Sequence, residues 1–171
     1  MATSVRTLPP TVARRLPPEE VALWGSLVSV TRSLFRHLQH DLRRVGVSVQ
    51  QYWVLQCLDV HGPLTAGKLS QWLEVTLPTV TGIADHLESI GYVHRSPAPE
   101  DRRRVLVRLT PKGMRMLRLL HQHHADIGRD LAQLVPDEER AELTRALVRI
   151  AARLTPDHGP CPGCHGETDL T

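Results

Sequence analysis

The sequence has 171 residues, of which 41% are hydrophobic, and this length and composition fit one folded domain with short tails rather than a disordered chain. The formal net charge is +3 and the isoelectric point about 9.1, so the protein is mildly basic and suits an anionic partner. Three cysteines are too few for a disulfide framework. Without an export signal or a run of about 18 apolar residues, the sequence predicts a cytoplasmic protein with no membrane partner.

The first 45 residues predict an arm followed by a long helix. Residues 1–16 contain a Pro-Pro pair and show no apolar periodicity, which favours a flexible arm. Pro17 and Pro18 precede two acidic residues, a pattern typical of a helix start. Leucine and valine then recur every three or four residues up to Gly46, which predicts an amphipathic helix over about 18–45. Because its apolar face exceeds what a small core can use, we expect it to join a homodimer.

Two short helices are expected next. Ser48 can cap a helix with the sequence SVQQYWVLQCLDV, which ends at a His-Gly-Pro triplet. Thr65 can cap a second helix, TAGKLSQWL, and a tight turn over residues 74–76 ends it.

A further helix of sequence LPTVTGIADHLESI follows that turn, with Pro78 in its first turn and Gly91 as its stop. Its apolar residues are expected to face inward, namely Leu77, Val80, Ile83, Ala84, Leu87 and Ile90. This helix and the short one before it, joined by a three-residue turn, predict a helix-turn-helix.

A β-hairpin is expected immediately after this helix pair. Residues 92–95 are expected to form a short strand, and residues 104–109 alternate valine and leucine on one face with arginine on the other. Thr110 can cap a long helix that begins at Pro111, and residues 136–139 open the last helix.

These elements predict a mostly α fold with a small β-hairpin, arranged as a winged helix-turn-helix with an α-helical homodimerisation region. The domain is expected to span residues 17–156. Within it, the helix-turn-helix and hairpin form a lobe over about 48–110, and the dimerisation helices lie at about 18–45 and 111–155. Residues 157–171 form a polar tail that contains cysteine.

The order of helix, turn, helix and charged hairpin suits binding to double-stranded DNA. The second helix can enter the major groove, while the hairpin reaches the adjacent minor groove, whose negative potential attracts arginine. The hairpin tip supplies Arg102, Arg103 and Arg104. We expect Asp101 to act as a brace, because a carboxylate beside guanidinium groups can fix their direction.

The stretch VTLPTVTGIADHLESIGYVHRSPAPEDRRRVLVRLTPKG resembles the recognition helix and wing of the MarR family of bacterial transcriptional regulators. Its most specific parts are the Asp-Arg-Arg triplet at 101–103, the alternating strand and the segment LTPKG at 109–113. The resemblance extends over residues 18–155. It implies a ligand-responsive, non-catalytic repressor that binds a pseudo-palindromic operator as a homodimer.

Carried over by position, the resemblance places DNA contacts on the start of the recognition helix and on the wing, at Thr76, Pro78, Thr79, Thr81, His86, Arg102, Arg103 and Arg104. Two positions depart from the family pattern. Gly82 stands where the family often has arginine, so base readout is expected to rely on threonine hydroxyls, on His86 and on DNA shape. Glu74 stands where the turn often has glycine, and a positive φ there would be mildly strained.

The resemblance also implies a small-molecule effector, bound between the long helices near the DNA-binding lobe. In this chain the corresponding pocket would be lined by His37, His40, Trp53 and Cys57. On its apolar helix face, Cys57 could equally be an inert buried thiol.

An alternative function is a metal- or thiol-responsive sensor. The pairs His37/His40 and His121/His124 are each three residues apart on a helix, which allows shared metal ligation. The tail segment HGPCPGCHGE offers Cys161, Cys164 and His165 as zinc ligands or as a redox dithiol, or it is inert. The sequence shows no Ser/His/Asp grouping, phosphate-binding loop or paired-carboxylate motif, so we do not expect an enzyme.

Overall fold

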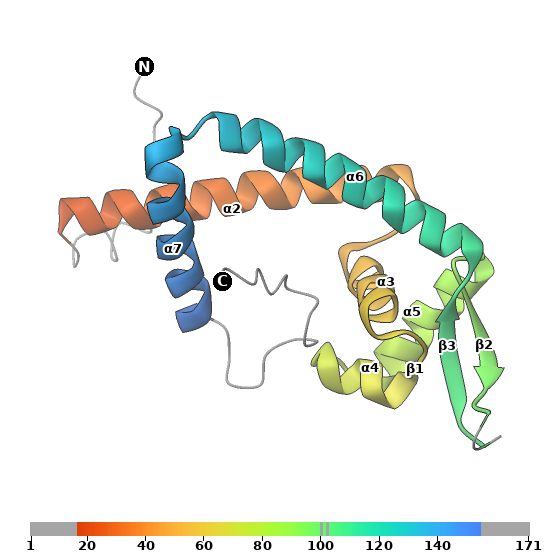
Figure 1. The fold of residues 1–171 in the computed structure, drawn as a ribbon. Helices are drawn as coiled ribbons and strands as arrows, with labels where there is room; N and C mark the ends of the chain where they lie inside the picture. The colour runs from red at the N-terminus through yellow and green to blue at the C-terminus, as the bar shows by residue number, and fades with distance from the viewer. Residues whose placement is uncertain (1–16, 100, 102, 155–171) are drawn as a thin grey trace. The chain divides into compact units, whose positions relative to one another are not determined.

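A computed structural model describes residues 17–99, 101 and 103–154 (Figure 1). The fold class predicted from the sequence is confirmed, because helices dominate and a small antiparallel sheet follows the helix-turn-helix. The chain divides into two compact units, one ending at Val49 and the other beginning at Gln50. Within the described ranges, no helix is both long and apolar enough to cross a membrane. The elements are α2 (Pro18–Arg44), α3 (Val49–His61), β1 (Leu64–Thr65), α4 (Ala66–Trp72), α5 (Leu77–Ser89), β2 (Val93–Pro97), β3 (Val105–Leu109), α6 (Pro111–Gln133) and α7 (Asp137–Leu154).

The first unit contains α2, whose two ends follow the predicted chemistry. Glu19 and Glu20 lie in its first turn and two arginines lie in its last turn, so charges of both signs complement the helix dipole. At the C-terminal end, the Val47 N–H donates to the Leu42 carbonyl at 3.0 Å while Gly46 takes a φ of +73°. This is a Schellman termination, in which glycine supplies the left-handed residue.

The core of the second unit lies between the helix-turn-helix and the sheet. Its fully buried apolar side chains come from α3, α4, α5, α6 and both long strands, and include Val54, Leu55, Leu69, Val80, Leu87, Val93, Val107 and Leu117. The inward orientation predicted for Leu77 is wrong, because its side chain is 51% exposed. Leu77 is the first residue of α5, and the buried stripe of this helix starts one turn later, at Val80.

The sheet has three strands in the order β1-β3-β2, all antiparallel. The sequence did not predict β1, because its two residues are too few to show alternation. β2 and β3 form the wing, with Val93 opposite Leu109 at the base and Pro97 opposite Val105 near the tip. Val107 is buried, whereas Val105 is 49% exposed because it lies beyond the core, toward the tip.

The end of α5 is joined to the start of α6 by a contact that we call the Tyr92 seam, formed by residues 90–92 and 110–113. The Thr110 N–H donates to the Tyr92 carbonyl at 3.0 Å, and the Thr110 hydroxyl donates to the Gly91 carbonyl at 2.7 Å. The same hydroxyl oxygen caps α6 by accepting from the Gly113 N–H at 3.1 Å. One threonine therefore ties the end of the helix-turn-helix to the first turn of α6.

Two further residues complete the seam. The Lys112 ammonium donates to the Ile90 carbonyl at 2.8 Å, which satisfies the C-terminal end of α5, and it lies 5.2 Å from the centre of the Tyr92 ring. Gly113 packs so closely on the backbone that a Cβ atom there would lie 2.2 Å from the Tyr92 carbonyl oxygen. The segment LTPKG thus has a structural explanation, since each of its last four residues starts or seats α6.

We predict that Gly113→Ala lowers the free energy of unfolding by about 3 kcal/mol, because the added methyl group would overlap backbone atoms that cannot rotate away. Gly128→Ala is the matched control on the same helix, since no atom outside its own turn lies within 4 Å of the new Cβ. It should instead stabilise α6 by about 0.5–1 kcal/mol. Urea unfolding of both variants measures the difference, and equal effects would contradict the close contact at Tyr92.

Candidate nucleic-acid interface

The helix-turn-helix is built by two threonine caps around a strained turn. The Thr65 hydroxyl accepts from the Lys68 N–H at 3.2 Å at the start of α4, and Thr76 accepts from the Thr79 N–H at 3.4 Å at the start of α5. Between the helices, Glu74 takes a φ of +52°. The sequence left the geometry of this turn open, and the structure shows that a residue with a Cβ atom occupies the left-handed region here, at the cost of mild strain.

The helical residues predicted to contact DNA all have exposed side chains: Thr76, Pro78, Thr79, Thr81 and His86. The opposite face of α5 is buried in the core, so the exposed face is free to enter a groove. Gly82 lies on this exposed face, where a Cβ atom would have no neighbour within 4 Å. No Lys or Arg occurs anywhere between Leu77 and Ser89.

The threonine hydroxyls of α5 have partners within the helix itself. Thr81 donates to the Leu77 carbonyl at 3.0 Å, and the hydroxyls of Thr76 and Thr79 share a hydrogen bond of 2.8 Å. These contacts engage the polar atoms that the sequence suggested for base readout and leave the threonine methyl groups on an exposed surface.

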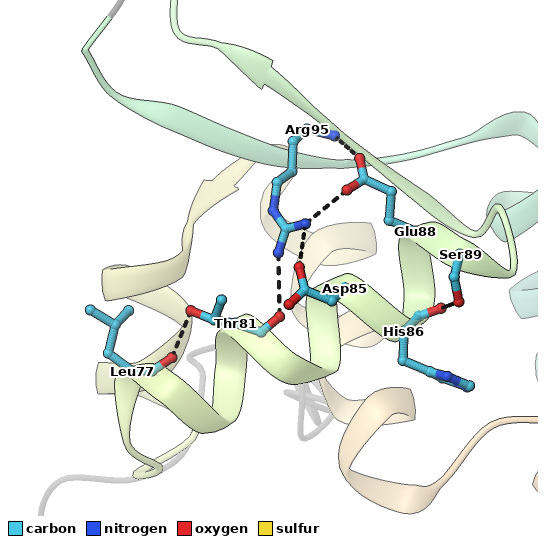
Figure 2. A network of polar contacts seen from close by, with 7 residues as sticks. All are labelled: Leu77, Thr81, Asp85, His86, Glu88, Ser89 and Arg95. Carbon is cyan, nitrogen blue, oxygen red and sulfur yellow. Dashed lines mark hydrogen bonds and ion pairs between the residues drawn. The ribbon is translucent and has the colours of Figure 1, made fainter.

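The sequence did not reveal the contact that joins the wing to α5. Figure 2 shows Arg95 reaching from β2 to α5, where its Nη1 atom lies 2.7 Å from Asp85 Oδ1 and 2.8 Å from Glu88 Oε2. Its Nη2 atom donates to the Thr81 carbonyl at 3.3 Å, and its backbone N–H donates to Glu88 Oε1 at 2.8 Å. The ring of His86 points away from this network.

Arg95 has two consequences for the interface. Burial alone would lower the pKa of Arg95, but the hydrogen bonds and charges of Asp85 and Glu88 raise it above its usual value, so the guanidinium stays charged. It therefore compensates two acidic groups on α5 that would otherwise repel phosphates. It also holds the wing at one position relative to α5.

Asp101 organises the described part of the wing tip through contacts with backbone N–H groups. Its carboxylate oxygen Oδ1 accepts from the Arg103 backbone N–H at 3.0 Å, and its carbonyl accepts from the Arg104 N–H at 3.0 Å. The Arg104 carbonyl accepts from the N–H of buried Ala98 at 2.8 Å. Arg103 and Arg104 have exposed side chains, whereas Arg102 lies outside the described residues, and so does any contact between its guanidinium and Asp101.

The four residues of the predicted effector pocket are divided between the two units. His37 and His40 are exposed residues of α2, whereas Trp53 is half-buried and Cys57 fully buried on α3. Because the pocket would span both units, it stays a prediction.

Within the second unit, polar side chains connect α3 with α6 next to Trp53. Gln56 donates to the Tyr52 hydroxyl and its carbonyl oxygen lies 3.2 Å from His121 Nε2, while the Tyr52 ring meets His124 edge-on. Burial raises the pKa of Tyr52, a further charge at Asp59 acts in the same direction, and the Gln56 bond only partly opposes them, so the phenol stays neutral. Sequence spacing had suggested His121 and His124 as a metal pair, but it gave no signal for Tyr52 and Gln56.

Among the residues that the structure describes, no group of three His, Cys, Asp or Glu side chains is arranged to hold a metal ion. Cys161, Cys164 and His165 lie outside the described residues. Zinc binding and thiol sensing by the tail therefore stay predictions.

Comparison with known proteins supports the resemblance seen in the sequence. The sequence model of the MarR family matches residues 47–105, from the start of α3 to the wing. YfiV of Bacillus subtilis, an uncharacterized HTH-type transcriptional regulator, is 32% identical over 74% of this chain and 79% of its own length. The multiple antibiotic resistance protein MarR of Salmonella typhimurium is 30% identical over 77% of this chain and 92% of its own length.

A solved structure shares the fold. The Staphylococcus aureus MepR–DNA complex superposes with a TM-score of 0.64 at 20% identity, and the match covers 74% of this chain and 96% of MepR.

We predict that Arg95→Met lowers the free energy of unfolding by about 2 kcal/mol, because it removes several charge-assisted hydrogen bonds and leaves Asp85 and Glu88 uncompensated. The triple variant that also carries Asp85→Asn and Glu88→Gln should recover much of this loss.

Arg129→Met is the matched control, because Arg129 forms a 2.7 Å pair with Asp126 on the exposed surface of α6. Its effect should stay below about 0.5 kcal/mol. Urea unfolding compares all three variants, and an Arg95 effect no larger than the Arg129 effect would refute the structural role of the network.

Proposed function

Because the chain belongs to the MarR family and is a DNA-binding transcriptional regulator, we propose that it acts as a ligand-responsive repressor that binds a pseudo-palindromic operator as a homodimer. The observation that carries this proposal is the joint placement of an exposed α5 face and an arginine-bearing wing tip, linked by Arg95. In this proposal the first turn of α5 enters the major groove, and Arg103 and Arg104 reach toward the minor groove.

Unburied apolar surface on the helices outside the DNA-binding lobe supports the dimer. None of the residues of α7 is buried, although an isolated 18-residue helix of this kind would be marginal in water. Its large exposed apolar side chains are Leu143, Leu147, Val148 and Leu154. α2 likewise leaves Leu23, Trp24, Val30, Leu34 and Phe35 exposed. A second copy of the chain would bury these side chains and bring two recognition helices to one duplex.

Repression is the simpler consequence of such binding. A dimer that covers an operator blocks access to a promoter by occupancy alone, whereas activation needs a further surface that contacts the transcription machinery.

An effector would act through α6. Between α3 and α6, the partly buried Gln56 side chain bonds both to the Tyr52 hydroxyl and to the His121 ring. A small molecule that competes for these hydrogen bonds would shift α6 relative to α3. Because the Tyr92 seam fixes the start of α6 to the end of α5, such a shift would move the recognition surface as well.

We predict that Leu147→Arg converts the dimer into a monomer and weakens operator binding at least tenfold, because it places a charge in the apolar stripe of α7 and uncouples the two half-sites. Sedimentation velocity and a gel-shift titration on the same preparation measure the two effects.

The matched control is Glu142→Arg, which places the same group on the exposed charged side of α7, about 140° around the helix axis from Leu147. It should leave the oligomeric state and the operator affinity unchanged. A Leu147→Arg protein that sediments as a dimer, or a wild-type monomer with full operator affinity, would overturn the proposed assembly.

A further inference from the structure

The exposed side of α5 is unusual for a DNA-reading helix because it carries no guanidinium or ammonium group. The segment from Leu77 to Ser89 contains no Lys or Arg, and position 82 is a glycine open to solvent. Arginine is the residue that most often reads guanine, through its O6 and N7 atoms. The arginine nearest to this helix, Arg95, is already held by Asp85 and Glu88 (Figure 2).

The first turn of α5 instead presents apolar groups. Leu77 is 51% exposed and is followed by exposed Pro78. The hydroxyls of Thr76, Thr79 and Thr81 make hydrogen bonds at the start of the helix, and these exposed residues also carry methyl groups that can contact a partner. Leu77, at the first position of α5, is therefore open to a partner that meets this end of the helix.

We propose that α5 selects A·T base pairs by apolar contact, with Leu77 packing against the C5-methyl group of thymine in the major groove. This inference rests on the proposed function, in which the first turn of α5 enters that groove. The thymine methyl is the one apolar group that a base pair exposes there, and small apolar side chains contact it. The N-terminal residues of a recognition helix are those that reach base edges, and Leu77 is the first residue of α5.

The charge distribution of the interface agrees with separate roles for α5 and the wing. The wing tip carries arginines suited to the negative potential of the backbone and minor groove, which attracts the protein to any duplex. The first turn of α5 contributes little charge and therefore little non-specific affinity. Leu77 is accordingly a specificity-determining residue, whereas the wing arginines supply binding strength.

The test uses deoxyuridine, which keeps every hydrogen-bonding group of thymine and lacks only the C5-methyl. The full chain first selects its operator from a random duplex pool. Each thymine of one half-site, together with its symmetry mate, is then replaced by deoxyuridine, and affinity is measured by fluorescence anisotropy. At one thymine position, replacement should weaken wild-type binding roughly fourfold for each half-site, which corresponds to one methyl group no longer buried.

Leu77→Ala completes the double-mutant cycle. This variant should bind the thymine and deoxyuridine duplexes with equal affinity, because the partner of the methyl group is gone. Since Leu77 is exposed, its truncation should not disturb folding, and circular dichroism checks this. Val60→Ala removes a similarly exposed apolar side chain from α3 and should retain the full deoxyuridine penalty.

Two results would overturn the inference while leaving the proposed function intact. One is wild-type affinity unchanged by deoxyuridine at every position, and the other is a deoxyuridine penalty that persists undiminished in Leu77→Ala. If the wild-type protein selects no duplex at all, the proposed function and this inference both fail.

Discussion

The close seating of α6 on the Tyr92 carbonyl is the contact on which the rest of the DNA-binding unit depends. Gly113 leaves no room for a side chain there, and Thr110 bonds to the same backbone segment while capping α6. Because β3 runs directly into Thr110 and α5 ends at the same point, this seam fixes the base of the wing, the end of the recognition helix and the start of α6 together. We therefore expect a displacement of α6 to be passed on to the DNA-binding surface.

Arg95 fixes the same unit from the wing. It binds two carboxylates of α5 and the carbonyl of Thr81, so the helix and hairpin act as one body when they meet a duplex. Because Arg95 is engaged in these contacts, it is not available to contact bases. The first turn of α5 has no charged side chain of its own, so we expect the wing tip to supply the electrostatic attraction to DNA. The pairing of Arg95 with Asp85 and Glu88 thus both fixes the wing relative to α5 and withholds this arginine from base contact.

Local chemistry made much of this fold predictable from the sequence. Helix ends were marked by residues with clear local preferences, namely Pro18, Gly46, Thr110 and Pro111. The predicted helix boundaries therefore agreed with the structure to within a few residues. β1 was missed because two residues show no pattern, and Leu77 was assigned to the core because periodicity cannot show where packing begins. The Arg95 network escaped notice because its partners lie seven and ten residues away, and only the reversal of the chain between α5 and β2 brings them together.

We propose that the wing tip, held by these contacts, delivers arginines to the DNA backbone and minor groove. The most direct test is to measure the operator affinity of Arg103→Ala at salt concentrations from 50 to about 300 mM. Arg118→Ala, on the exposed side of α6, is the control. We expect weaker binding and a salt dependence whose log–log slope is shallower by about one per wing, because each lost phosphate contact releases one counterion fewer. An affinity and slope equal to those of the wild type and of Arg118→Ala would contradict the claim.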